Sequence, residues 1–164
     1  MEKALACYLD ACIAIKLVTK EPGSEQIAAY MKDNWASHFH ITEFAFYETL
    51  SVLKRKWLKQ EITEHKYLSA IFLLQAYTEQ RGLQIDSDFR PDQPHIVVKL
   101  RELVLKHEID FSDALQIYTV LNGKWRRSDP EWKPIFVTSD QALLKAAEAE
   151  GLRTWNFPDG DPPQ

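Results

Sequence analysis

The stretch Ala4-Leu-Ala-Cys-Tyr-Leu-Asp10 is a short apolar run that ends in an acidic residue. A run of this length is typical of a buried β-strand. A second run of the same kind, Ile135-Phe-Val-Thr-Ser-Asp140, lies near the other end of the chain. Parallel α/β sheets gather the carboxyl ends of their strands along one edge, and ligand sites form there. The two runs therefore predict a parallel sheet that brings Asp10 and Asp140 to the same edge.

Helical patterns and weaker strand patterns alternate between and after these two runs. Further strands are expected over Trp35–His40, Leu83–Ile85 and Thr154–Phe157. Helices are expected over Cys12–Val18, from Ser24 onward, and over Thr42–Gln60, Lys66–Gln80, Pro94–His107, Asp113–Leu121 and Gln141–Glu150. In the third of these helices, near-helical spacing predicts a core stripe of Phe46, Leu50, Leu53 and Trp57. Alternation with an excess of helix predicts a parallel sheet wrapped by helices.

The bulk properties indicate a single soluble domain. The chain has 164 residues, and we expect one domain over residues 1–157 and a flexible tail over residues 158–164. The formal net charge of −4 means that bulk charge does not favour nucleic acid. Only two cysteines occur, Cys7 and Cys12, which argues against a disulfide framework. The absence of a signal peptide and of a long apolar stretch predicts a cytoplasmic protein that does not enter a membrane.

Two more acidic residues fall where a helix can deliver them to the same edge. Asp113 opens an apolar stretch that is predicted to be helical, and Glu48 lies within a helix, away from its apolar stripe. Several carboxylates held together cannot all stay ionised without a cation between them. Mg²⁺ and Mn²⁺ are the natural cations for sites built only from oxygen ligands. The combination points to a metal-dependent phosphodiesterase.

Each of the four acids also has a purely structural explanation. Asp10 and Asp140 precede helices, where Asp is a preferred N-cap, and Asp113 can favour the positive end of a helix dipole. Glu48 can equally be a solvated glutamate. The sequence leaves these interpretations open, but it shows no competing catalytic pattern. GxGxxG, Walker A, HExxH, paired CxxC and GxSxG are all missing, and a surface or interstrand role is expected for His38 and His40.

Four motifs along the chain resemble those of the PIN-domain ribonucleases, and especially the VapC-type toxins of bacterial toxin–antitoxin pairs. In order, the matching segments are Tyr8–Leu17 with Glu21–Glu25, Glu48–Arg55, Phe111–Leu115 and Phe136–Asp140, followed by the Lys145…Gly151-Leu152 ending. Each motif is weak alone, but four in register cover nearly the whole chain. The resemblance implies a three-layer α/β/α fold whose central parallel sheet has about four to five strands.

The resemblance also implies an activity and a set of site residues. It implies a Mg²⁺- or Mn²⁺-dependent endoribonuclease that hydrolyses RNA phosphodiester bonds, with Asp10, Asp113 and Asp140 as metal ligands. Glu48 would bind metal or orient the attacking water, and the hydroxyl of Thr138 or Ser139 would assist. The partners implied are an RNA substrate, a cognate antitoxin and a second copy of the chain in a homodimer.

The sequence departs from the family pattern in several places. Cys12 stands where a small polar residue is common, which puts a supporting hydrogen bond in question. Glu43 and Asp110 are acids close to Glu48 and Asp113, but they are out of register with the motifs. The insert Asn122–Pro134 is longer than expected, and its cations and tryptophans suit either a solvated loop or a single-stranded RNA contact.

A second cationic run leaves the same choice open, because a solvated helix end and an RNA contact both suit it. It consists of Lys54, Arg55, Lys56 and Lys59. Two alternative functions also remain. One is a catalytically inactive PIN scaffold that binds RNA or a protein. The other is a phosphatase with Asp10 as nucleophile, which is disfavoured because position 12 is Cys rather than a second Asp.

Overall fold

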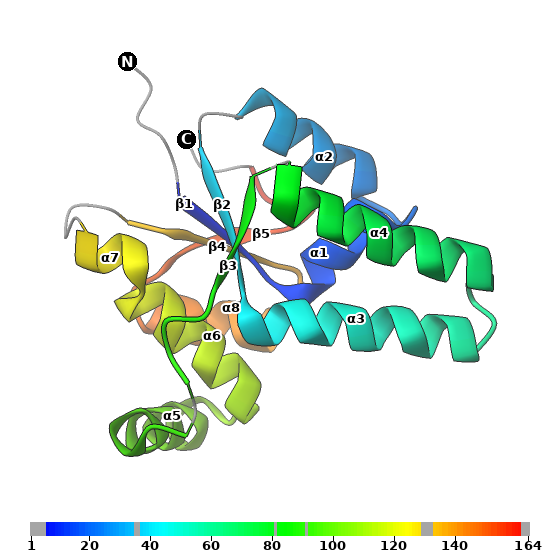
Figure 1. The fold of residues 1–164 in the computed structure, drawn as a ribbon. Helices are drawn as coiled ribbons and strands as arrows, with labels where there is room; N and C mark the ends of the chain where they lie inside the picture. The colour runs from blue at the N-terminus through cyan, green and yellow to red at the C-terminus, as the bar shows by residue number, and fades with distance from the viewer. Residues whose placement is uncertain (1–5, 35–36, 81, 91, 129–132, 162–164) are drawn as a thin grey trace.

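The fold is built on a parallel five-stranded sheet, seen edge-on at the centre of Figure 1. The computed structural model describes residues 6–34, 37–80, 82–90, 92–128 and 133–161. Its strands are β1 (Ala6–Leu9), β2 (His38–Thr42), β3 (Leu83–Asp86), β4 (Ile135–Thr138) and β5 (Arg153–Asn156). They lie in the order β3-β2-β1-β4-β5, and every neighbouring pair is parallel. The predicted parallel sheet is therefore confirmed, although residues 4, 5, 35 and 36 of the expected strands lie outside the described part.

Helices cover both faces of the sheet and make a three-layer α/β/α fold (Figure 1). One face packs against α1 (Ala11–Val18), α2 (Ser24–Asp33), α3 (Glu43–Leu58) and α4 (Glu64–Gln80). The other face packs against α5 (Pro94–His107), α6 (Phe111–Asn122) and α8 (Gln141–Ala149). A short helix, α7 (Lys124–Ser128), follows α6 within the described residues.

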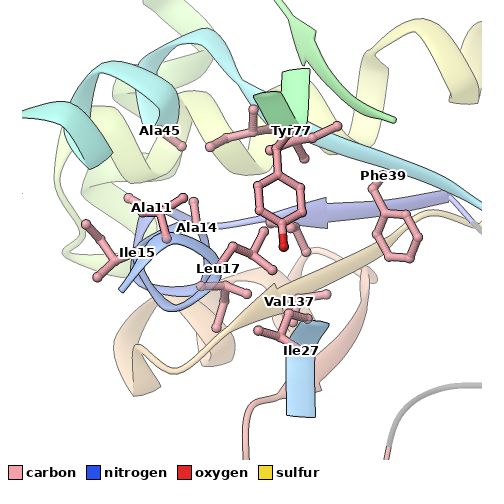
Figure 2. Packing of buried hydrophobic residues seen from close by; sticks show 14 of the residues in the cluster. Ala11, Ala14, Ile15, Leu17, Ile27, Phe39, Ala45, Tyr77 and Val137 are labelled. Carbon is pink, nitrogen blue, oxygen red and sulfur yellow. The ribbon is translucent and has the colours of Figure 1, made fainter. Parts of the chain in front are cut away.

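Alternation along the strands divides the core between the two faces. Cys7 and Leu9 of β1 belong to the cluster beneath α1–α4, whereas Tyr8 between them belongs to the cluster beneath α5, α6 and α8. Strands buried on both faces are largely apolar, which explains why β1, and β4 up to Thr138, are apolar runs. Figure 2 shows part of the first cluster, where Leu17 of α1 and Val137 of β4 lie among its side chains.

The core stripe predicted for the third helix is wrong in part. The buried side chains of α3 are Ala45, Thr49 and Leu53, and only the last of them was predicted. The helix packs against both α1 and α4, and two of its three buried side chains, Ala45 and Thr49, are small. Phe46 and Leu50 flank this line and are half-buried, while Trp57 stacks on Tyr67 at a ring-centroid distance of 5.0 Å. Tertiary packing on two sides therefore decides which helical face is buried.

The insert between α6 and β4 contains the helix α7, which the sequence patterns did not predict. Arg127 of α7 donates to Asp88 at 2.5 Å, and its guanidinium lies 5.4 Å from the centre of the Phe89 ring. This cation is therefore used to hold α7 against the segment that follows β3. Residues 129–132 of the insert, including Trp132, lie outside the described part of the chain.

The chain end beyond β5 begins with a turn that contacts the core. The indole of Trp155, which is buried, donates to the Gly160 carbonyl at 2.8 Å. Gly23, at the start of α2, has a φ of +89°, and a Cβ there would meet the Phe157 ring at 2.6 Å. Residues 162–164 of the predicted tail lie outside the described part.

Among the described residues, no helix is long and apolar enough to cross a membrane.

The strand order places a crevice between β1 and β4. The chain leaves β1 to build β2 and β3 on one side, and it later adds β4 and β5 on the other. Ligand sites of open parallel sheets form where the strand order reverses in this way. Asp10 directly follows β1 and Asp140 follows β4 by two residues, and the Asp10 amide donates to the Val137 carbonyl at 3.0 Å. The fold therefore brings both predicted acids to this crevice.

Candidate active site

The four predicted acids line one pocket of about 390 Å³. Asp10 and Asp140 reach it from the ends of β1 and β4, Glu48 from α3 and Asp113 from the first turn of α6. Asp113 is the third residue of its helix rather than its opening residue, because α6 begins at Phe111. The structure thus brings together all four side chains that the sequence motifs singled out.

Asp10 is buried, with 6% of its surface exposed, and it is held by four hydrogen bonds. One carboxylate oxygen, Oδ1, accepts from the Ala11 amide at 2.7 Å and from the Gln116 side-chain amide at 3.2 Å. The other, Oδ2, accepts from the Thr138 hydroxyl at 2.9 Å and from the Cys12 thiol at 3.0 Å. Together these four donors fix the orientation of the Asp10 carboxylate.

Cys12 supplies the supporting hydrogen bond that its departure from the family pattern put in question. Its thiol donates to Asp10 and accepts from the Ser139 hydroxyl at 3.2 Å and the Ser139 amide at 3.4 Å. Burial and the neighbouring Asp10 carboxylate raise the pKa of the Cys12 thiol to about 12. The thiol therefore stays protonated at neutral pH and remains a donor to Asp10.

Asp140 is both the N-cap of α8 and a lining residue of the pocket. Its Oδ1 caps α8 by accepting from the amides of Ala142 at 2.8 Å and Leu143 at 3.0 Å. Its own amide donates to the Thr138 hydroxyl at 3.0 Å, and that hydroxyl in turn donates to Asp10. The cap therefore fixes a carboxylate that still lines the pocket.

The electrostatics of the pocket reflect crowded negative charge. Burial, followed by the charges of Asp10, Asp140, Asp110 and Glu48, raises the pKa of Asp113 to about 7. Burial and the Asp10 charge also raise the pKa of Glu48, against an opposing influence from the Arg55 guanidinium. At neutral pH a large fraction of Asp113 therefore carries a proton, and a cation in the pocket would compete with that proton.

The donor set of the pocket fits a hard divalent cation. The acids offer only oxygen ligands, which Mg²⁺ and Mn²⁺ prefer, and a cation would offset both the burial of charge and the repulsion that raise the pKa of Asp113. Within the described part of the chain, no three His, Cys, Asp or Glu side chains are gathered closely enough to hold a metal ion. The carboxylates thus share a pocket without forming a finished ligand cage.

Sequence reasoning set aside one acid that lines the pocket and overlooked a buried amide. Asp110, at the N-cap position of α6, also lines the pocket, whereas the exposed Glu43 does not. Gln116 is fully buried and lies one helical turn after Asp113. A lone glutamine among apolar residues on the same helix face as a motif acid was the signal available for it. His40 is also buried, 5.0 Å from the Tyr8 ring, and does not line the pocket.

Substitutions at Gln116 test how strongly this amide supports Asp10. Gln116→Leu should change the free energy of unfolding by no more than about 1 kcal/mol, because the lost donor is offset by removal of the buried, unpaired Oε1. Gln116→Glu should lower it by about 2–4 kcal/mol, because a second carboxylate is buried against Asp10. Urea unfolding at pH 7 measures both. Equal losses for the two variants would show that size, rather than charge, matters at this position.

Comparisons with known proteins agree with this fold. The sequence profile of the PIN domain family matches residues 7–149. The crystal structure of PAE2754 from Pyrobaculum aerophilum aligns with 94% of this chain and 92% of that chain, with a TM-score of 0.58 and 16% sequence identity. At this identity the likeness concerns the fold alone. No curated protein matches the chain.

Proposed function

The chain belongs to the PIN domain family, and from this premise we propose that it is a metal-dependent endoribonuclease. Proteins of this family are typically nucleases, and they generally use divalent metal ions. The observation that carries the proposal is the single pocket lined by Asp10, Glu48, Asp113 and Asp140 at the crevice between β1 and β4. An RNA phosphodiester is the substrate that the motif resemblance favours.

The residues of the pocket divide the work of hydrolysis. Asp10, Asp113 and Asp140 would hold the ion, with Asp10 kept in place by Thr138 and Cys12. Mg²⁺ or Mn²⁺, when bound, lowers the pKa of water and offsets negative charge on the phosphate oxygens. Glu48, whose pKa is raised by burial, would orient the attacking water and take up its proton.

Cleavage of a labelled single-stranded RNA by the purified protein tests the proposal. We expect cleavage with Mg²⁺ or Mn²⁺, loss of cleavage on chelation with EDTA, and recovery when excess metal is added back. Gel electrophoresis of the products measures this, and a DNA of the same sequence serves as the comparison substrate. Undiminished RNA cleavage in EDTA would contradict the proposed mechanism.

We also propose that the protein is a VapC-type toxin that acts in the cytoplasm, forms a homodimer and is neutralised by an antitoxin. The motif resemblance supports the toxin role. Large apolar side chains at the surface, such as Phe72 and Leu105 at 70% and 74% exposure, offer area for protein contacts. Induced expression with and without the neighbouring small gene tests the toxin role, and light scattering tests the dimer. Equal growth in both strains, or a monomer, would contradict the respective proposal.

The alternative is an inactive PIN scaffold that binds RNA or a protein. The observation in its favour is that no three metal-binding side chains are gathered among the described residues. Calorimetric titration with Mg²⁺ and Mn²⁺ separates the two, because the scaffold predicts no binding heat while the enzyme predicts saturable binding. The raised pKa of Asp113 adds a marker, since a bound ion would displace its proton.

A further inference from the structure

Two lysines line the acidic pocket, and one glutamate forms an ion pair with each of them. The Lys56 ammonium lies 2.8 Å from one carboxylate oxygen of Glu21, and the Lys16 ammonium lies 3.8 Å from the other. Lys16 also donates to the Pro22 carbonyl at 3.0 Å, and Lys56 contacts Glu61 at 3.4 Å. Lys16, Glu21 and Lys56 all line the pocket, and we call them the lysine rim.

Helical spacing explains why these lysines face the acids. Glu48, Val52 and Lys56 line the pocket from α3 at intervals of four residues, so they share one face of the helix. Lys16 of α1 follows Cys12, another lining residue, at the same interval. The other members of the cationic run at the end of α3 are exposed and do not line the pocket: Lys54, Arg55 and Lys59.

The lysine rim supplies the positive charge in the lining of an acidic pocket. Six acidic side chains and two lysines line the pocket, which leaves a formal charge of −4 when all are ionised. RNA is a polyanion, and its phosphates bind proteins chiefly through Lys and Arg. The metal ion offsets charge at the acids, but phosphates beside the cleaved one need their own cations. In the lining of this pocket, Lys16 and Lys56 are the side chains that can supply them.

We propose that Lys16 and Lys56 bind a phosphate of the RNA next to the cleaved one, and that Lys56 exchanges Glu21 for this phosphate. The Lys56 side chain is 26% exposed, so a change of rotamer that breaks its ion pair with Glu21 can bring its ammonium to a phosphate. Glu21 then competes with RNA for the lysines and lowers its affinity. This inference rests on the proposed ribonuclease function and names the contacts that hold its substrate.

Binding of a fluorescent single-stranded RNA by the full-length protein tests the exchange. The Asp10→Asn background slows cleavage enough for binding to be measured, Mg²⁺ is present, and anisotropy is recorded over a range of salt concentrations. Lys56→Ala should weaken binding about 5- to 10-fold and reduce the slope of log Kd against log salt by about 0.7, the value for one lost phosphate contact on a single strand. Glu21→Gln should tighten binding several-fold, because both lysines lose the carboxylate of Glu21 that competes with the RNA phosphate.

Matched variants control for bulk charge. Lys59→Ala removes a lysine from the exposed end of α3, and Glu64→Gln removes an exposed acid from the start of α4. Neither should match the effect of its partner variant. Equal losses for Lys56→Ala and Lys59→Ala, or tighter binding of a polyglutamate peptide than of RNA, would overturn the inference. If either result is obtained with a protein whose wild type cleaves RNA, only the role of the lysine rim is refuted. If the wild type does not cleave RNA in the presence of metal, the proposed ribonuclease function is itself refuted.

Discussion

Asp10→Asn is expected to reduce RNA cleavage by about 10³-fold or more, the largest effect of any single substitution in the pocket. The carboxylate lies at the centre of the site, because Thr138, Cys12 and Gln116 all donate to it. Asn has nearly the same shape but no charge to offer a cation. Initial rates with labelled RNA at saturating Mg²⁺ measure the loss.

A folding control separates this loss from a loss of structure. The side-chain amide that replaces the carboxylate would face donors, so a decrease in stability of about 1–3 kcal/mol is expected together with a native circular dichroism spectrum. Asp33→Asn, at the exposed end of α2, serves as the matched substitution and should cleave RNA at the wild-type rate. A folded Asp10→Asn protein with wild-type activity would contradict the assignment of the site.

Asp113→Asn is expected to change activity and stability in opposite directions. Cleavage should fall by about 10²-fold or more, because a metal ligand loses its charge. The metal-free protein should become more stable by about 1–2 kcal/mol at pH 8, a value discounted for the partial exposure of Asp113. Asn imitates the protonated acid, so the substitution removes the cost of burying a charged carboxylate and the repulsion from the neighbouring acids, which together raise the pKa of Asp113 to about 7.

The sign of the pH dependence follows from that raised pKa. The folded protein holds the Asp113 proton more tightly than the unfolded chain does, so ionisation costs stability as the pH rises from about 4 to about 7. The advantage of Asp113→Asn should therefore be small at pH 5 and full at pH 8. Urea unfolding in EDTA at both pH values measures it. An equal gain at both pH values would contradict the repulsion, and Mg²⁺ should raise the Tm of the wild type more than that of the variant.

Local patterns predicted the parts of the fold that depend on local physics. The apolar runs before Asp10 and Asp140 became β1 and β4, because strands buried on both faces are largely apolar. The N-cap interpretation and the metal-site interpretation looked like alternatives, yet Asp140 both caps α8 and lines the pocket. The two roles of Asp140 have one cause. The helix α8 starts at the edge of the sheet where ligands bind, so the residue that caps it also lies at the pocket.

The remaining parts depend on contacts between distant residues. Gln116 reaches Asp10 across 106 positions of sequence, and only the tertiary fold reveals that pairing. The motif register excluded Asp110, although its place at the N-cap position of α6 puts it in the pocket. The lysines of α3 look equivalent in sequence, and the packing of α3 beside α1 decides that Lys56 faces the acids. Strand and helix patterns therefore located the site, whereas tertiary packing selected its supporting residues.

The place of β4 in the sheet also bears on when a newly made chain acquires its acidic pocket. This strand is the fourth to be synthesised, but it lies directly beside β1 and delivers the Thr138 hydroxyl to Asp10 across 128 positions. A nascent chain that has not yet extended past this region lacks both Thr138 and Asp140. Pairings over such separations form late and slowly. A nascent chain would therefore complete the acidic pocket only after β4 and Asp140 have been made and have packed beside β1.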